Sequence, residues 1–288
     1  MLATAKSSSR YGVLAAALLF STGGAAIKAC SFSGWQVAGL RSGIAALALW
    51  LLVPGSRRGW TWQTLLVGAF YAATMILFVT ANKLTTSANA IFLQSTAPLY
   101  LLILGPLFLK ESVRRADILA MAAVGAGVAL LLSGSETTVV TAPNPYLGNF
   151  VAAGAGLMWA LTLAGLRWTA KTGGPHAGEA TAVAGNVIAF AACLPMAFPL
   201  TGGSVTDWSA VVYLGIFQVA LAYVFLTRSL RHVPGLEAST LLLAEPVFNP
   251  VWSWLIHGEH PSPAALSGGV LILASAVFLS GFRARTQA

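Results

Sequence analysis

Residues 245–259 read EPVFNPVWSWLIHGE, and residues 97–111, which read APLYLLILGPLFLKE, follow the same plan. Each stretch has a proline at its second position, continues as an apolar run of helical length, and closes with a glutamate. A further apolar run follows each stretch and ends in Leu-Ser-Gly, at 132–134 and at 279–281. The chain is therefore predicted to contain one structural unit twice, with a period of about 140 to 148 residues.

The beginnings of the two units also match. Residues 20–28 (FSTGGAAIK) and 159–167 (WALTLAGLR) each run from an aromatic to a basic residue, and Trp62 aligns with Trp208. If each unit crosses the membrane an odd number of times, the second unit must enter it with the opposite orientation. We therefore expect an inverted repeat, an arrangement common in secondary transporters.

The composition is that of a membrane protein. Of 288 residues, 57% are hydrophobic and 8% charged, and the mean hydropathy is +0.78, whereas a soluble domain carries about 25% charged residues. Crossing about 30 Å of hydrocarbon takes about 20 helical residues, so ten spans would use about 200 residues. The net charge of +8 does not indicate a nucleic-acid partner, because the basic residues gather at predicted helix ends rather than on one soluble face.

Apolar runs between polar or Gly/Pro breaks predict an all-α membrane protein with ten transmembrane helices in two inverted five-helix repeats. The spans are predicted at 11–28, 35–53, 62–83, 87–109, 115–132, 146–168, 179–200, 208–232, 236–257 and 263–282. The first repeat then covers 11–134 and the second 146–282, with an external linker at 135–145 and cytoplasmic tails at 1–10 and 283–288.

The basic residues predict the orientation. With both termini in the cytoplasm of a bacterial inner membrane, thirteen of the sixteen Lys and Arg residues fall on the inner side. Lys28 and Lys83 fall at the outer side, and Arg41 lies within the second span. An asymmetry this strong normally sets the orientation of a multi-pass protein.

At this point the chain resembles the EamA-type transporters of the drug/metabolite transporter superfamily. The resemblance rests on residues 245–250 with Glu259, on their first-half counterparts Pro98 and 110–111, and on Lys28 at the end of the first span. It implies a basket of helices around a central substrate cavity, and relatives include YddG-type amino-acid exporters. It also implies transport of small organic metabolites, with export of aromatic or other apolar amino acids as the first expectation.

Three prolines are expected to disturb spans in both halves: Pro98, Pro246 and Pro250. Proline lacks a backbone donor and clashes with the carbonyl four residues earlier, so it frees backbone oxygens inside the bilayer. One interpretation is a kink that only shapes packing. The other is a hinge whose carbonyls face the cavity.

Two charged residues are expected deep in the membrane. Glu245 is placed near the middle of its span, where an acidic side chain costs about 2.5 to 3.5 kcal/mol. It is interpreted either as a proton carrier for transport or as a structural carboxylate. Arg41 is interpreted either as a side chain that reaches loop carbonyls or as a guanidinium that binds a substrate carboxylate.

Aromatic and polar residues in six spans are candidates for the cavity, since small-molecule sites are mostly apolar with a few orienting polar groups. The candidates are Phe20, Thr22, Tyr71, Gln94, Tyr100, Trp159, Phe217, Gln218, Tyr223, Asn249 and Trp252. Such a cavity favours an amphipathic metabolite over a sugar phosphate, which would need several basic residues. For each residue alone, packing or lipid contact is the alternative.

Other functions receive little support. The cluster of His257, Glu259 and His260 lacks a further ligand set, so neither a metal nor a cofactor is expected, and no nucleotide-binding or hydrolase motif occurs. An intramembrane enzyme would need more converging titratable groups. A facilitative channel or uniporter, and export of other amphipathic metabolites or drugs, remain the alternatives. The expected partners are a small-molecule substrate and the lipid bilayer, with protons as a candidate coupling ion; Gly39 and Gly43 leave a homodimer as the alternative to a monomer.

Overall fold

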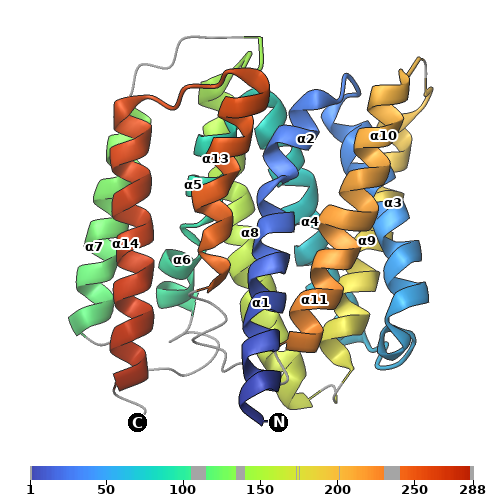
Figure 1. Ribbon diagram of the computed structural model, residues 1–288, viewed down its shortest axis with the longest axis horizontal. Coiled ribbons are helices and arrows are strands. Elements are labelled where there is room, and N and C mark those ends of the chain that lie inside the picture. Colours follow the sequence, from blue (N-terminus) through green and yellow to red (C-terminus); the bar gives the residue numbers. More distant parts are fainter. Residues whose placement is uncertain are drawn as a thin grey trace.

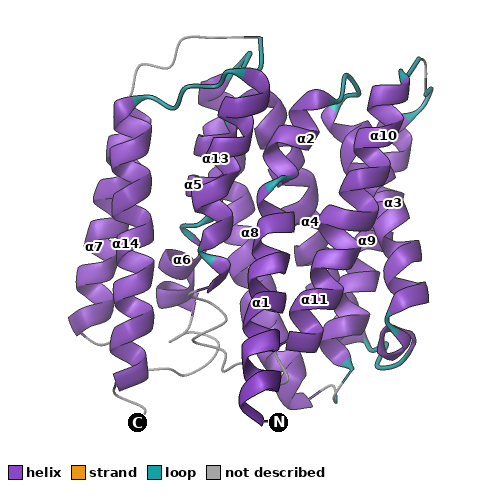
Figure 2. Ribbon diagram, in the orientation of Figure 1, coloured by secondary structure: helices purple, strands orange, loops and turns teal. Residues whose placement is uncertain are grey.

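The protein is a helical bundle, seen here in a computed structural model that describes residues 2–104, 115–133, 140–172, 174, 176–200, 202–229 and 241–285. Within these ranges it forms helices joined by short loops, and no β-strand (Figure 2). The beginning of α1 (Leu2–Ser21) and the end of α14 (Pro263–Arg285) lie at the same end of the bundle (Figure 1). The opposite end, where α2 (Gly23–Ala29) lies, is called the α2 end below.

Both halves are built from long helices and shorter helical pieces. The first half continues with α3 (Gly34–Leu52), the short 3₁₀ turn η1 (Pro54–Arg57), α4 (Trp62–Leu84), α5 (Ser87–Gln94), α6 (Ala97–Leu104) and α7 (Arg115–Ser133). The second half comprises α8 (Pro145–Thr172), α9 (Ala177–Ala197), α10 (Val205–Tyr213), the π-helical segment η3 (Leu214–Leu221), α11 (Ala222–Ser229), α13 (Ala244–His257) and α14.

Side chains fix where several helices begin. Ser33 and Gln36 form a reciprocal capping box at the start of α3, and Ser204 and Asp207 form another at the start of α10. Such boxes satisfy backbone donors that have no partner within the helix. Asp207 also accepts a hydrogen bond from the hydroxyl of Ser31 at 2.9 Å, which ties α10 to the loop after α2.

The two halves pack against each other rather than standing apart. α3 packs on α9, and α7 packs on α14. The contact between α4 and α8 has its counterpart in the contact of α1 with α11, and the contacts of α5 and α6 with α8 correspond to that of α13 with α1. Each of these contacts between two predicted spans therefore has a counterpart between their repeat partners, as expected for two related units.

Small residues allow these helices to approach closely. A Cβ atom added to Gly39 would lie 2.8 Å from the Cβ of Cys193, and one added to Gly43 would lie 2.9 Å from the ring of Phe190. Cys193 and Phe190 both belong to α9. The GxxxG pair of the second span therefore serves packing between the halves of one chain.

Within the described ranges, six helical stretches are long and apolar enough to cross a membrane: 9–29, 34–52, 62–84, 145–170, 177–197 and 205–229. Large apolar side chains also point outward, among them Leu47 (63% exposed), Ile118 (57%) and Leu255 (62%). Parts of the predicted spans at 87–109, 208–232 and 236–257 fall on residues 105–109, 230–232 and 236–240, outside the described ranges. The all-helical class is confirmed, and the count of ten spans stays a prediction.

Several predicted spans are interrupted. A turn at Thr22 separates α1 from α2, residues 95–96 separate α5 from α6 just before Pro98, and a turn at Leu243 precedes α13. Pro246 lies in the first turn of α13, and Pro250 lies inside it. These interruptions fall in helices at the interface of the two halves.

Candidate functional site

A buried ion pair lies at the α2 end of the bundle. The Nζ atom of Lys28, on α2, lies 2.8 Å from the Oε1 atom of Glu259, which follows α13. The two side chains are only 2% and 4% exposed. Because a charge buried alone is strongly disfavoured, each holds the other in place.

Backbone groups complete the surroundings of this pair. Lys28 donates to the carbonyl oxygens of Thr85, at 2.8 Å, and Thr141, at 2.5 Å. Glu259 Oε2 accepts a hydrogen bond of 3.0 Å from the backbone N–H of Ser87. The pair thus joins α2, the loop between α4 and α5, the segment before α8 and the end of α13, and we call it the latch.

The histidines beside the latch have other contacts. His257 Nε2 lies 2.8 Å from the carbonyl oxygen of Ala25, and the ring of His260 packs edge-on against Trp254 at 6.1 Å. Within the part of the chain that the structure describes, no group of three or more His, Cys, Asp or Glu side chains is placed to hold a metal ion. Glu259 is instead engaged by Lys28.

A second polar site surrounds Arg41 on α3. Its side chain is 1% exposed, and its guanidinium donates to the Met75 carbonyl at 3.2 Å and to Gln218 Oε1 at 3.5 Å. Its Nε atom has no hydrogen-bond partner among the residues that the structure describes. Among the described residues, no carboxylate forms an ion pair with Arg41.

The π-helical segment η3 places Gln218 in this site. Gln218 is 6% exposed, and its Nε2 atom donates to the carbonyl of Phe20 at 3.4 Å, so its amide bridges α3 and the last turn of α1. A π-helix is rare and frequently marks a functional site. Gly23, directly after the turn at Thr22, leaves room for this amide, because an added Cβ would lie 2.9 Å from Nε2.

Aromatic rings lie beside these polar side chains. Tyr223 meets Phe20 and Tyr71 edge-to-face, at centroid distances of 6.3 and 6.2 Å. The Tyr71 hydroxyl accepts a hydrogen bond of 3.5 Å from Asn186 Nδ2, while Asn186 Oδ1 has no partner within the described part of the chain. We call this group of side chains the guanidinium cluster; it consists of Arg41, Gln218, Tyr71, Asn186, Tyr223 and Phe20.

The other predicted cavity residues are dispersed over the bundle. Thr22 lies 3.0 Å from the Tyr213 hydroxyl, Trp252 Nε1 donates to Ser21 at 2.9 Å, and Tyr100 donates to the Ala153 carbonyl at 3.2 Å. Phe217 is 44% exposed and stacks on Tyr213, whereas Gln94 and Trp159 are half-buried on α5 and α8. The structure therefore gathers four of the eleven predicted cavity residues, together with Arg41, in the guanidinium cluster: Phe20, Tyr71, Gln218 and Tyr223.

Another group of buried polar side chains lies between α2, α5 and α13. Among the described residues, both amide atoms of Asn249 and the hydroxyls of Ser87 and Ser253 lack hydrogen-bond partners. An added Cβ on Gly24 would lie 2.6 Å from Asn249 Oδ1 and 2.8 Å from the Ser87 hydroxyl. Glu245, in the first turn of α13, is half-buried and makes no ion pair with the described residues.

Sequence reasoning missed Asn186, Ser87 and Ser253. A signal was present for Asn186, which interrupts an apolar helix with an amide in the same way as Gln218 does. The two serines carry a weaker signal, because serine is common at helix interfaces within membranes.

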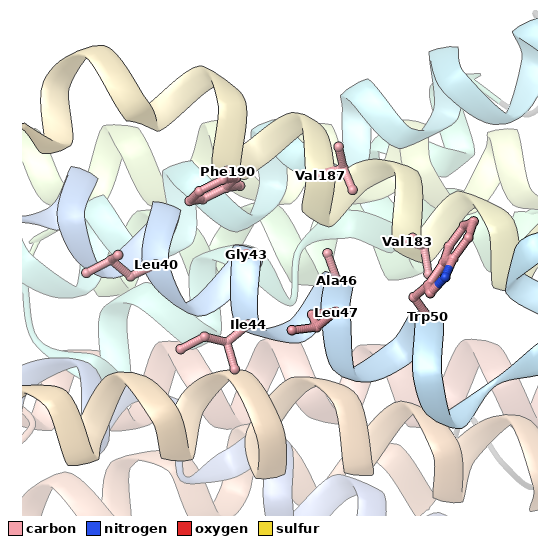
Figure 3. Close-up of a pocket in the computed structure, with 9 residues that line it drawn as sticks. All are labelled: Leu40, Gly43, Ile44, Ala46, Leu47, Trp50, Val183, Val187 and Phe190. Carbon is pink, nitrogen blue, oxygen red and sulfur yellow. The ribbon is translucent and has the colours of Figure 1, made fainter.

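The groove in Figure 3 lies elsewhere. It has a volume of about 530 Å³ and is lined by apolar side chains of α3 and α9, among them Leu47, Trp50, Val187 and Phe190. Leu47, Trp50 and Val187 are 63%, 40% and 44% exposed, so the groove opens to the outside of the bundle. None of the predicted cavity residues lines it.

Comparisons with known proteins agree with this architecture. The model of the EamA-like transporter family matches residues 10–133 and, a second time, residues 146–281. The chain is thus a multi-pass membrane transporter built of two repeats, and it belongs to the EamA-like transporter family.

Similar proteins include the pseudopaline exporter CntI of Pseudomonas aeruginosa, in strains UCBPP-PA14 and PAO1. Each is 26% identical over 284 residues, which cover 94% of this chain and 96% of the exporter. A solved crystal structure is similar with a TM-score of 0.65 at 21% identity, over 98% of this chain and 99% of the other. That likeness shows the shared fold.

Proposed function

We propose that the chain is a secondary transporter that exports small organic metabolites by alternating access, with aromatic or other apolar amino acids as the first candidates. The latch carries this proposal. Its two residues come from different repeats, and both are buried at one end of the bundle. A contact of this kind can close one end of a carrier while the halves rock against each other.

The repeat symmetry supports the mechanism. The second repeat is proposed to be inverted relative to the first, so that each helix contact at one end has a related contact at the other. The interruptions near Thr22, residues 95–96 and Leu243 supply hinge positions within the interface helices. Pro98, Pro246 and Pro250 lie close to these hinges and are proposed to keep them deformable.

The proposed orientation follows from charge. The loop between α3 and α4, which contains Arg57 and Arg58, lies at the same end as the start of α1 (Figure 1). Placing this end in the cytoplasm of a bacterial inner membrane satisfies the positive-inside rule. The latch then lies at the outer side, and ten spans place both termini in the cytoplasm.

Counterflow in proteoliposomes tests the function. Purified protein is reconstituted into liposomes loaded with unlabelled compound, and exchange of the labelled compound is measured with and without a pH gradient. The panel contains L-phenylalanine, L-tryptophan, L-leucine and pseudopaline. We expect saturable counterflow of at least one panel member; conductance without saturation or exchange would indicate a pore instead.

Transport measured with and without the pH gradient tests whether Glu245 carries protons. A half-buried acid without an ion-pair partner among the described residues is a candidate proton carrier. Acceleration of transport by the gradient would support proton coupling, and its absence would favour facilitated diffusion.

A further inference from the structure

We infer that the guanidinium cluster binds a carboxylate group of the transported substrate and that this carboxylate takes the place that Gln218 Oε1 has beside Arg41 in the structure. The inference rests on the proposed transport function, since it names the substrate class of that site. The predicted substrate is an organic acid with one carboxylate and an aromatic or apolar body.

The charge of Arg41 is the first argument. The structure describes the side chains of four acidic residues: Glu179 lies 3.3 Å from His176, Asp207 caps α10, Glu259 pairs with Lys28, and Glu245 has no contact with Arg41. A cation buried within a membrane bundle normally pairs with an acid or lines a substrate path. Among the described residues, the acceptors that Arg41 reaches are an amide oxygen, a backbone carbonyl and the Met75 sulfur at 3.5 Å.

The second argument is the geometry of the donors. A guanidinium presents five N–H donors in a planar fork, which matches the two oxygens of a carboxylate. Here the Nη1 donor reaches Gln218 at 3.5 Å, a long hydrogen bond, and Nε has no partner in the described ranges. A carboxylate would give this fork a charged acceptor that the amide cannot provide.

The neighbouring groups indicate the rest of the substrate. Tyr71, Tyr223 and Phe20 form a continuous aromatic wall, and Asn186 Oδ1 is a buried acceptor without a donor. An ammonium group could donate to this oxygen while an apolar side chain packs on the rings. A phosphate or a dicarboxylate would need a second cation, and among the described residues Arg41 is the one cationic side chain of the guanidinium cluster.

Gln218→Glu tests the inference without knowledge of the substrate. The change keeps the shape of the side chain and supplies the counter-ion that Arg41 lacks. We expect the melting temperature of the purified protein to rise by at least about 3 °C, because the buried guanidinium gains an ion-pair partner. The rise should vanish when Arg41→Met is present in the same chain, since the introduced carboxylate would then be the unpaired charge. Gln63→Glu, in the first turn of α4, is the matched control and should leave the melting temperature unchanged.

Ligand binding provides the second measurement. L-phenylalanine should raise the melting temperature of the wild-type protein, and L-phenylalaninamide, which lacks the carboxylate, should raise it far less. In Gln218→Glu, the L-phenylalanine concentration that gives the same rise in melting temperature should be at least about tenfold higher, because the introduced carboxylate occupies the guanidinium donors of Arg41.

Three results would overturn the inference: a Gln218→Glu protein no more stable than wild type, a stabilisation that persists with Arg41→Met, or equal or absent responses to acid and amide. These readouts do not depend on transport. If no compound shows counterflow while the Arg41-dependent stabilisation is found, the proposed function fails and the carboxylate site stands. Counterflow at equal rates for an acid and its amide would support the proposed transport function and contradict the carboxylate site.

Discussion

Breaking the latch should open the α2 end of the bundle. In Lys28→Met the apolar side chain keeps the length of the lysine and removes its charge, so Glu259, 4% exposed, is left buried without its partner. The carbonyls of Thr85 and Thr141 lose the same donor. An open state, in which water reaches Glu259, is then favoured over the closed one.

The size of the effect follows from the burial of the pair. Removing one partner of a buried ion pair costs about 3 to 5 kcal/mol. If the whole cost falls on the closed state, the ratio of open to closed protein rises by about 150-fold to several thousandfold. Relaxation around Glu259 reduces this value, so we expect an increase of at least about tenfold.

Cys30 provides the assay, because it directly follows α2 and is 2% exposed. Burial raises the pKa of its thiol to about 11, so the closed protein presents little of the reactive thiolate. In a Cys193→Ala background, maleimide should alkylate Cys30 at least about tenfold faster after Lys28→Met.

The controls separate opening from local damage to α2. Glu259→Gln breaks the same pair from the other half of the chain and should accelerate alkylation similarly. The double variant Lys28→Met/Glu259→Gln leaves no charge at the latch and should react more slowly than either single variant. Arg57→Met, at the far end of the bundle, should have no effect. Unchanged alkylation in both single variants would refute the role assigned to the latch.

Three further predictions concern other parts of the interface. Gly24→Ala places a Cβ atom 2.6 Å from Asn249 Oδ1 and should lower stability by about 1 to 3 kcal/mol in thermal or denaturant unfolding, whereas Gly125→Ala, with no neighbour within 4 Å, should not; equal effects would contradict the packing argument. Glu245→Gln should abolish acceleration of transport by a pH gradient, and a variant that keeps both the wild-type rate and the pH response would rule out the proton-carrier role. Pro250→Ala, inside α13, should raise the melting temperature and slow counterflow if the proline keeps a hinge deformable; unchanged counterflow would leave it a packing residue.

Much of the fold could be predicted because it is dictated by the bilayer. Apolar runs and turn residues located the helices, and the family resemblance carried by residues 245–250 and Glu259 is confirmed by the match over both halves. The two-repeat organisation followed from the same motif. The π-helical segment at Leu214–Leu221 was not predicted, since its apolar sequence is equally compatible with an α-helix.

The site was harder to predict because its contacts join distant parts of the chain. Lys28 and Glu259 were recognised as motif residues, yet their pairing depends on how the halves pack. Arg41 was noticed as a charge within a span, but the absence of an acidic partner among the described residues appears only when its neighbours are known. Asn186 was missed because its partner Tyr71 lies on another helix.

Reversible locking of the latch tests alternating access most directly. Lys28→Cys and Glu259→Cys are introduced together after Cys30 and Cys193 are replaced by Ala, and the pair is bridged by a short bifunctional methanethiosulfonate. Counterflow should stop in the bridged protein and return when a reductant cleaves the bridge, while each single-cysteine variant treated in the same way stays active. Undiminished counterflow in fully bridged protein would contradict the proposed mechanism.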